Sequence, residues 1–233
     1  MSSRFCKLRR HIFASLLCPT LFIAVLLAGP ILAAAQTFTT IYTFPGGTGG
    51  PGGLVVGTAG ALYGISGGGV PKSCGTSACG MVFQLTPPVK SGGNWTLSTI
   101  YKFLGGSDGG NPVGRLLVGN KGAIYGVTFN GGNAASSCDV TGCGTVFQLT
   151  PPVKTGGSWT KKTIYSFSGP DGANPLAGVI SDKLGNLHGT TSGGGDSNAL
   201  AGIVFELSPP AVTGNPWTET LIHAFNPFDG RHD

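Results

Sequence analysis

The feature that most restricts the fold of this chain is a phrase that it contains three times. The sequence "GALYGISGGG" at residues 60–69 returns as "GAIYGVTFNGG" at 122–132 and as "GNLHGTTSGGG" at 185–195. Internal repetition on the scale of tens of residues is typical of propellers, solenoids and other arrays, in which each repeat buries its surface against its neighbours. The chain is therefore expected to be an array of similar units.

Further phrases recur in the same order within each unit. The stretch "MVFQLTPPVKSGGNW" at residues 81–95 returns twice in closely similar form, and each copy ends in a tryptophan. The three tryptophans, Trp95, Trp159 and Trp217, are 64 and 58 residues apart. A phrase of the type "TIYKF" follows each of them. The ordered recurrence of these parts indicates one conserved architecture within each unit.

Each unit contains four short runs with the composition of β-strands. In the middle unit these runs are residues 115–119, 123–127, 145–150 and 159–167. They are rich in Val, Ile, Phe, Tyr and Thr, and turn-forming residues bound them, which is typical of strands separated by turns. Because no stretch has the period of an amphipathic helix, the sequence predicts an all-β fold. The first run has its equivalents at 53–57 and 177–181.

Four antiparallel strands in about 60 residues are typical of one blade of a β-propeller. We expect three such units, at about residues 45–103, 104–167 and 168–225, within one tandem-repeat domain at 36–233. Residues 37–44 repeat the fourth run alone, so the fold class is a partial β-propeller of about three blades plus one orphan N-terminal strand. This strand, and a last phrase like the start of a further unit, favour a truncated fragment of a longer repeat protein. The alternatives are an open arc and assembly with other chains.

Several residues that recur in the units are predicted to have structural roles. The tyrosine of the second strand is expected to fill a contact between blades, and the glycine after it to let a neighbouring backbone come close. His188 and His223 stand at tyrosine positions, so we interpret them as aromatic substitutes rather than ligands. For the tryptophans, packing is favoured over stacking on sugars. The predicted structural positions are Tyr63, Tyr125 and His188, Gly64, Gly126 and Gly189, Phe83, Phe147 and Phe205, and Trp95, Trp159 and Trp217.

The first 35 residues have the pattern of a secretory signal peptide. A basic stretch precedes a long apolar run, which ends in Ala33-Ala34-Ala35, an A-x-A cleavage sequence. The alternative is an uncleaved membrane anchor. The full chain has 14 Lys and Arg against 9 Asp and Glu, but four of the basic residues lie in this segment. The mature chain is thus nearly neutral, so we expect neither nucleic acid nor, after cleavage, a membrane as its partner.

Four cysteines follow the predicted signal peptide, in two pairs of equal spacing. They are Cys74 with Cys79 and Cys138 with Cys143. Paired cysteines in an exported chain predict disulfides, and the alternative is a zinc site built from all four thiolates. The third unit has no cysteine at this place, so each bridge is expected to be an optional staple.

The sequence offers little evidence for catalysis or for a cofactor. Residues 64–68 fit G-x-S-x-G, but a glycine-rich loop follows where a nucleophile elbow needs a helix. Asp108, Asp171 and Asp229 recur before glycine, where turn formation is favoured over calcium binding because one carboxylate per unit is too few. We therefore predict no catalytic residues, no metal site and no cofactor.

The combined motif, from "LYG" through "G.VF.L" and "IY.F" to "DG.NP", resembles the GloVer-type tandem repeat of exported bacterial proteins, the "choice-of-anchor" group. The resemblance covers residues 37–233. It implies an exported β-repeat protein and supplies no catalytic residue set. Members of the group tend to carry more repeats and a C-terminal sorting sequence, and this chain departs from the group in both respects.

The sequence favours a secreted, non-enzymatic β-repeat protein of the extracellular space, periplasm or cell surface. It would act as a binding or surface-interaction scaffold for an unknown ligand, such as a carbohydrate or another surface protein. Self-association through open blade edges is a further expectation. The alternatives are a secreted carbohydrate-active propeller enzyme, or a fragment of one, and a gene fragment without a function of its own.

Overall fold

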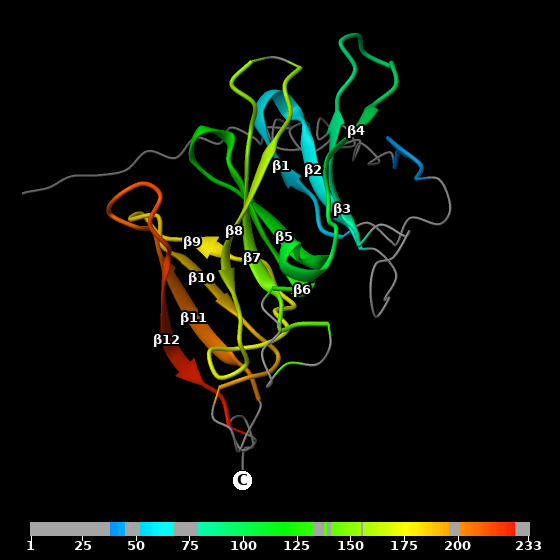
Figure 1. Ribbon diagram of the computed structural model, residues 1–233. Coiled ribbons are helices and arrows are strands. Elements are labelled where there is room, and N and C mark those ends of the chain that lie inside the picture. The colour runs from blue at the N-terminus through cyan, green and yellow to red at the C-terminus, as the bar shows by residue number, and fades with distance from the viewer. Residues whose placement is uncertain are drawn as a thin grey trace, which may run out of the picture. The chain divides into compact units, whose positions relative to one another are not determined.

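The computed structural model describes residues 38–44, 52–67, 79–132, 138, 141–154, 156–195 and 201–226, and its strands all belong to the compact unit Ile41–Asp233. The predicted signal peptide at 1–35 lies outside the described residues. The described residues form twelve strands in three four-stranded sheets (Figure 1). The first sheet contains β1 (Val55–Val56), β2 (Leu62–Ser66), β3 (Met81–Thr86) and β4 (Thr96–Lys102). The second contains β5 (Gly110–Val118), β6 (Ile124–Asn130), β7 (Thr145–Thr150) and β8 (Thr160–Ser166). The third contains β9 (Ile180–Ser181), β10 (Leu187–Thr190), β11 (Ile203–Ser208) and β12 (Thr218–Ala224).

Every sheet is an antiparallel meander whose strands pair in chain order. None of the sheets closes into a barrel, and the described residues contain no α-helix, only the short 3₁₀ turns Thr58–Gly60, Gly106–Asp108 and Asn120–Gly122. The predicted all-β fold of tandem four-stranded units is therefore confirmed. The arrangement is consistent with blades of a partial propeller.

The turns between the first two strands depend on left-handed backbone. In the first sheet Ala59 has a φ of 53° and Gly60 a φ of 74°, and in the second Lys121 and Gly122 have φ values of 56° and 76°. Two successive residues with positive φ are the signature of the tight turn that matches the twist of a β-hairpin. Glycine at the second of the two positions adopts a positive φ without steric cost.

The first strands differ more between sheets than the sequence predicts. The run 53–57 gives only the two residues of β1, and 177–181 gives only the two of β9, whereas β5 extends over nine residues. β5 is longer because Gly110–Val113 pairs with the end of β6. In the third sheet the corresponding segment makes only an isolated bridge, Ala173 to Gly193.

A phenylalanine at the end of each fourth strand joins one sheet to the next. Phe103 follows β4 and packs edge-on against Phe147 of β7, with ring centroids 5.1 Å apart. Phe167 follows β8 and contacts Phe205 of β11 in the same way, at 5.2 Å. None of these four rings is more than 1% exposed. Burial of one such side chain contributes about 1.5–3 kcal/mol, so these contacts are major terms in the two junctions between sheets.

We call the contact between the first and second sheets junction 1, and that between the second and third junction 2. A separate buried cluster fills each junction. In junction 1 side chains of β2 and β3 meet side chains of β6 and β7, and in junction 2 β6 and β7 meet β10 and β11. Each sheet therefore buries its faces against its neighbours, which is the mode of stabilisation expected of repeat proteins.

The expected orphan strand is not formed in the described part of its range. Residues 38–44 have no strand assignment, because a strand needs a neighbour for its backbone hydrogen bonds and no described strand pairs with this segment. Its aromatic residues still follow the repeat. Tyr42 contacts Phe44, and Phe44 packs against Phe83 with ring centroids 5.0 Å apart, which reproduces the contact of Phe103 with Phe147.

The glycine after each second-strand tyrosine serves a different purpose from the one predicted. A Cβ on Gly64 would lie 2.5 Å from the Cζ of Phe83, and Gly126 stands in the same relation to Phe147. The register pairs each glycine directly with that phenylalanine. The missing side chain thus makes room for an aromatic ring of the adjacent strand, and not for a neighbouring backbone.

A close approach of two backbones occurs instead at Gly114 and Gly178. A Cβ on Gly178 would overlap the carbonyl oxygen of Arg115, and a Cβ on Gly114 would overlap the amide of Gly178. Gly178 lies just before β9 and Gly114 lies within β5, so this contact joins the second and third sheets.

We predict that Gly178→Ala destabilises the fold by about 1–3 kcal/mol, because the new methyl group has no space in junction 2. Gly53 occupies the same repeat position in the first sheet, and a Cβ there would meet only ordinary contacts at 3.7 Å or more. Gly53→Ala should change stability by no more than about 0.5 kcal/mol. Urea denaturation of both variants measures the difference, and equal effects would contradict the close approach.

Candidate functional site

The connections from first to second strand and from third to fourth strand lie at the same end of each sheet, because the sheets are antiparallel meanders. We call this end the hairpin end. It presents two loops from each sheet, and loops carried by a rigid scaffold are the usual place for binding residues. The hairpin end comprises residues 57–61, 87–95, 119–123, 151–154, 156–159, 182–186 and 209–217.

The loops after the third strands expose apolar tips. Val89 and Val153 occupy equivalent positions in the first two sheets, and each is as exposed as in an extended chain, at 104%. Val212 of the third sheet is 63% exposed. Gly93 donates its amide to the carbonyl of Lys90, at 3.1 Å, and Gly157 does the same to Lys154, at 3.0 Å. The first two sheets thus hold an identical loop with an exposed valine next to a lysine.

Two hollows lie at the hairpin end of the second sheet. One of about 370 Å³ is lined by Lys121, Tyr125, Gln148 and Pro151, among others. The other, of about 410 Å³, lies between the second and third sheets and is lined by Tyr125, Asp182 and neighbouring residues. Tyr125 borders both hollows, so the two form one region of the hairpin end.

The tyrosine of each second strand bonds to its partner on the third strand. Gln148 Nε2 donates to the Tyr125 hydroxyl at 3.0 Å, and Gln84 Nε2 donates to Tyr63 at 3.4 Å. Burial raises the pKa of Tyr125, and the bond from Gln148 opposes that shift only in part. The Tyr125 phenol therefore stays neutral and can still donate its hydrogen to a ligand.

The third sheet replaces this tyrosine–glutamine pair with His188 and Glu206. His188 stands in the tyrosine position, and its Nε2 lies 3.7 Å from a carboxylate oxygen of Glu206 and 3.7 Å from one of Asp182. Burial acts to raise the pKa of Asp182, but hydrogen bonds from Asn186, Leu184 and Gly185 outweigh it and lower that pKa. The described residues hold no group of three or more His, Cys, Asp or Glu placed to share a metal ion.

The tryptophans pack against the tyrosines of the preceding sheet. Trp159 meets Tyr63 with ring centroids 6.1 Å apart, and Trp217 meets Tyr125 at 6.3 Å, both in T-shaped geometry. Trp95, at the same position in the first sheet, is also half-buried. Trp159 and Trp217 therefore lie at the hairpin-end margin of junction 1 and junction 2 respectively.

A third hollow, of about 350 Å³, lies beside the first strands of all three sheets. It is lined by Val55, Val56, the segment 115–118 and the segment 178–180. Arg115 is its charged residue, and it is exposed. The rest of the lining is mostly aliphatic, so this hollow offers one guanidinium in an apolar setting.

The G-x-S-x-G sequence does not form a nucleophile elbow. Ser66 is the last residue of β2, is only 3% exposed, and pairs with Met81. Its equivalent Thr128 shares a 2.7 Å hydroxyl–hydroxyl bond with Thr145. The equivalent in the third sheet, Thr191, accepts the amide of Ile203. Hydroxyl groups at this position thus fix the start of the third strand in the second and third sheets.

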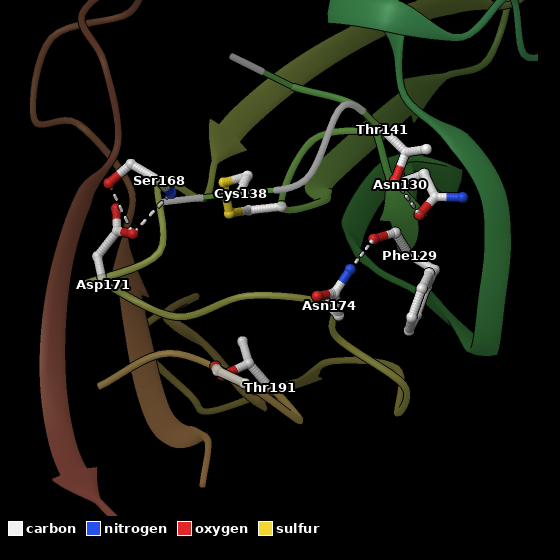
Figure 2. Close-up of a disulfide and its surroundings, with 10 residues drawn as sticks. Phe129, Asn130, Cys138, Thr141, Ser168, Asp171, Asn174 and Thr191 are labelled. Carbon is white, nitrogen blue, oxygen red and sulfur yellow. Dashed lines mark hydrogen bonds between the residues drawn. A yellow bond between two sulfur atoms is a disulfide. The ribbon is translucent and has the colours of Figure 1, made fainter. Parts of the chain in front are cut away.

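The predicted disulfide between Cys138 and Cys143 is confirmed, with Cα atoms 5.2 Å apart. Cys79 is also disulfide-bonded, while its predicted partner Cys74 lies outside the described residues. Figure 2 shows the bridge together with the loop of Asp171 and with Asn174. The backbone amide of Asn174 donates to the carbonyl of Cys143 at 2.7 Å, so the bridged loop anchors the entry to the third sheet.

The recurring aspartates accept bonds from tyrosine and from their own turns. The Tyr101 hydroxyl donates to Asp108 at 2.8 Å, and the Tyr165 hydroxyl donates to Asp171 at 2.6 Å. Burial, followed by the bonded aspartate, raises the pKa of both phenols. Asp229 lies outside the described residues.

Two charged residues of the fourth strands are not apparent from the repeated phrases. Lys161 forms an ion pair with Asp108 in junction 1, at 3.0 Å. Glu219 stands at the same repeat position in the third sheet. An alignment of the three fourth strands shows Leu97, Lys161 and Glu219 at one position. The change from an apolar to a basic to an acidic residue at this one position was the sequence signal for these two charged residues.

Comparison with known proteins identifies the family to which the chain is similar. Residues 31–233 match the family model of the Gloeobacter/Verrucomicrobia repeat. No curated protein matches the chain. In the part of the chain that the structure describes, no helix has the length and hydropathy needed to cross a membrane.

We predict that replacing both Cys138 and Cys143 by serine lowers the free energy of unfolding by roughly 2 kcal/mol, the value expected for so short a closed loop. The fold should persist, because the third sheet forms without a cysteine at this place. Circular dichroism and urea denaturation of the double variant measure both outcomes. Loss of the β-sheet spectrum would show that the bridge is required for folding.

Proposed function

Because the chain belongs to the Gloeobacter/Verrucomicrobia repeat family, we propose that it is an exported, non-enzymatic repeat scaffold whose hairpin end binds a partner at the cell surface. The observation that carries the proposal is the repeated exposure of valine in the loops after the third strands. Val89 and Val153 are both 104% exposed and stand in loops of identical hydrogen bonding.

An exposed aliphatic side chain is unremarkable when it occurs once, but its regular recurrence at one end of a scaffold supports a binding role. The first two loops place a lysine directly after the valine, Lys90 and Lys154. An apolar tip beside a cation suits contact with a protein surface, because protein interfaces combine an apolar centre with a polar rim. Repetition of the tip allows several weak contacts to act together as one strong attachment.

A protein partner is favoured over a polysaccharide. Sugar-binding sites usually offer the open face of an aromatic ring, whereas Trp159 and Trp217 pack against tyrosines of the preceding sheet. Asp182 lines one of the hairpin-end hollows, and its carboxylate and that of Glu206 both lie 3.7 Å from Nε2 of His188. This arrangement offers less to a carbohydrate-active enzyme than to a binding scaffold.

Export is supported by two features. The segment 1–35 combines a basic start, an apolar run and a small-residue end. The disulfide between Cys138 and Cys143 suits an oxidising compartment, since such bonds are rare in reducing cytosol.

We predict that the full chain, expressed in a Gram-negative host, is exported and recovered with Gln36 as its first residue. Mass spectrometry of the periplasmic and medium fractions measures this. Replacing Ala33 and Ala35 by lysine should leave the uncleaved precursor, because the peptidase requires small residues at these two places. A wild-type chain that stays in the cytoplasm with Met1 at its start would overturn export.

We predict that the double variant V89S/V153S of the exported chain binds washed cell envelope at least ~10-fold more weakly than the wild type, because two of the repeated contacts are lost. The matched control is Leu104→Ser. Leu104 is 77% exposed but lies after β4, at the opposite end of the sheet.

Pull-down of the labelled chain with envelope fractions measures the binding. Prior digestion of the envelope with protease should abolish it. Binding that survives digestion would assign the partner to the polysaccharides, and equal weakening by Leu104→Ser would exclude the hairpin end as the binding face.

A further inference from the structure

Junction 1 contains a buried ammonium group that links the first two sheets. Lys161 of β8 has a side chain only 5% exposed. Its Nζ donates to the Asp108 carbonyl oxygen at 2.5 Å, to Asp108 Oδ1 at 3.0 Å and to Thr163 Oγ1 at 2.6 Å. It also lies 5.9 Å from the ring centre of Phe103. A buried cation is tolerated here because oxygen acceptors surround it.

Junction 2 repeats the frame of this site. Asp171 accepts the Tyr165 hydroxyl, as Asp108 accepts that of Tyr101. The backbone amide and the hydroxyl of Ser168 also donate to Asp171, at 2.7 and 2.9 Å. The carboxylate that pairs with the lysine in junction 1 therefore has its counterpart in junction 2.

The cation itself has no counterpart at that position. In the second sheet Lys161 pairs with Leu149, and in the third sheet Glu219 pairs with Leu207, so Glu219 stands where the lysine should be. Leu221 stands at the position of Thr163, which removes the hydroxyl acceptor as well. Junction 2 thus brings a second carboxylate towards Asp171, where junction 1 brings an ammonium.

The Glu219 carboxylate is poorly accommodated in its ionised form. Its Oε1 is closed to solvent and has no hydrogen-bond partner in the structure. Burial, and then the charge of Asp171, raise the pKa of Glu219. An unpaired buried acceptor beside a like charge costs free energy, and binding a proton removes that cost.

We propose that junction 2 is a proton-operated joint between the second and third sheets. When Glu219 takes up a proton from solvent, its carboxyl group becomes a hydrogen-bond donor towards Asp171 and replaces the lysine of junction 1. When Glu219 loses that proton, the two carboxylates repel each other and the third sheet is held less firmly. This inference is independent of the proposed binding function.

The groups that face Glu219 from the neighbouring elements support this assignment. Asp171, in the loop after β8, and Tyr165, in β8, are the titratable groups that interact with it electrostatically. From β11 the residue directly opposite is Leu207, which is apolar. The adjacent Glu206 contacts His188 and Ser208 instead.

The direction of the pH effect follows from the raised pKa. A carboxyl group that binds its proton more tightly in the folded state contributes stability that is complete below the ordinary glutamate pKa of 4.5. That contribution is lost as the pH rises through the folded-state pKa. The contact between the second and third sheets is therefore more stable in acid than at neutral pH.

The titration of Glu219 can be observed directly, because the chain contains only two glutamates, Glu206 and Glu219. Labelling the glutamate side-chain carboxyl carbons with ¹³C gives two signals in the full exported chain. The variants E206Q and E219Q assign them. We expect the Glu219 signal to titrate at a midpoint above 4.5, and a midpoint at or below 4.5 would overturn the proposal.

Thermal unfolding across pH 4 to 8 tests whether ionisation of Glu219 weakens the contact between the second and third sheets. The wild type should lose a few degrees of midpoint relative to E219Q as the pH rises, since the amide cannot ionise. The double variant E219K/L221T rebuilds the lysine site of junction 1 and should remove that loss.

A mirrored exchange serves as the matched control. K161E/T163L moves the acidic pair into junction 1, where the wild-type protein has none, and should add a second loss of stability with rising pH. If E219Q follows the same pH profile as the wild type, the joint does not exist. If E219K/L221T retains the loss, Glu219 is not its origin.

Discussion

A four-stranded sheet of this size cannot bury its two faces by itself, and the phenylalanine at the end of each fourth strand meets this constraint. Phe103 and Phe167 leave their own sheets and pack against Phe147 and Phe205 of the next ones. The glycines opposite Phe147 and Phe205, and the tyrosine–tryptophan contacts at the margin, all take their places around these rings. Folding of one sheet is thereby coupled to the presence of its neighbour.

Repetition made most of this architecture predictable from the sequence. A residue type that recurs at one position in the units meets the same surroundings each time, so Tyr63 was recognisable as part of a contact between units and Trp159 as a packing residue. The third strand at 145–150 was predicted residue by residue. The disulfide between Cys138 and Cys143 followed from the equal spacing of two cysteine pairs.

The features that were not predicted, or were predicted wrongly, also have specific physical causes. The role of Gly64 depends on the register that places it opposite Phe83, and composition does not reveal register. The first strands at 53–57 and 177–181 shrink to two residues each, because pairing depends on what the adjacent strand offers. Residues 38–44 have the composition of a strand but no described partner to pair with. The roles of Lys161 and Glu219 were not predicted, because comparison of the units selects residues that recur. These two residues matter because they carry opposite charges at the same repeat position.

The aromatic contacts also define how such a chain can be lengthened. Each junction joins a ring that ends one unit to a ring inside the next, so a four-stranded sheet on its own is not the natural block for exchange. A segment cut directly after Phe103 and directly after Phe167 carries one donor ring and one acceptor ring, and its duplication would keep every such pair intact. Recombination at these boundaries would add or remove a unit while every phenylalanine at the end of a fourth strand keeps a partner ring in the next sheet. The same two cuts offer an engineer a cassette for building longer or shorter arrays.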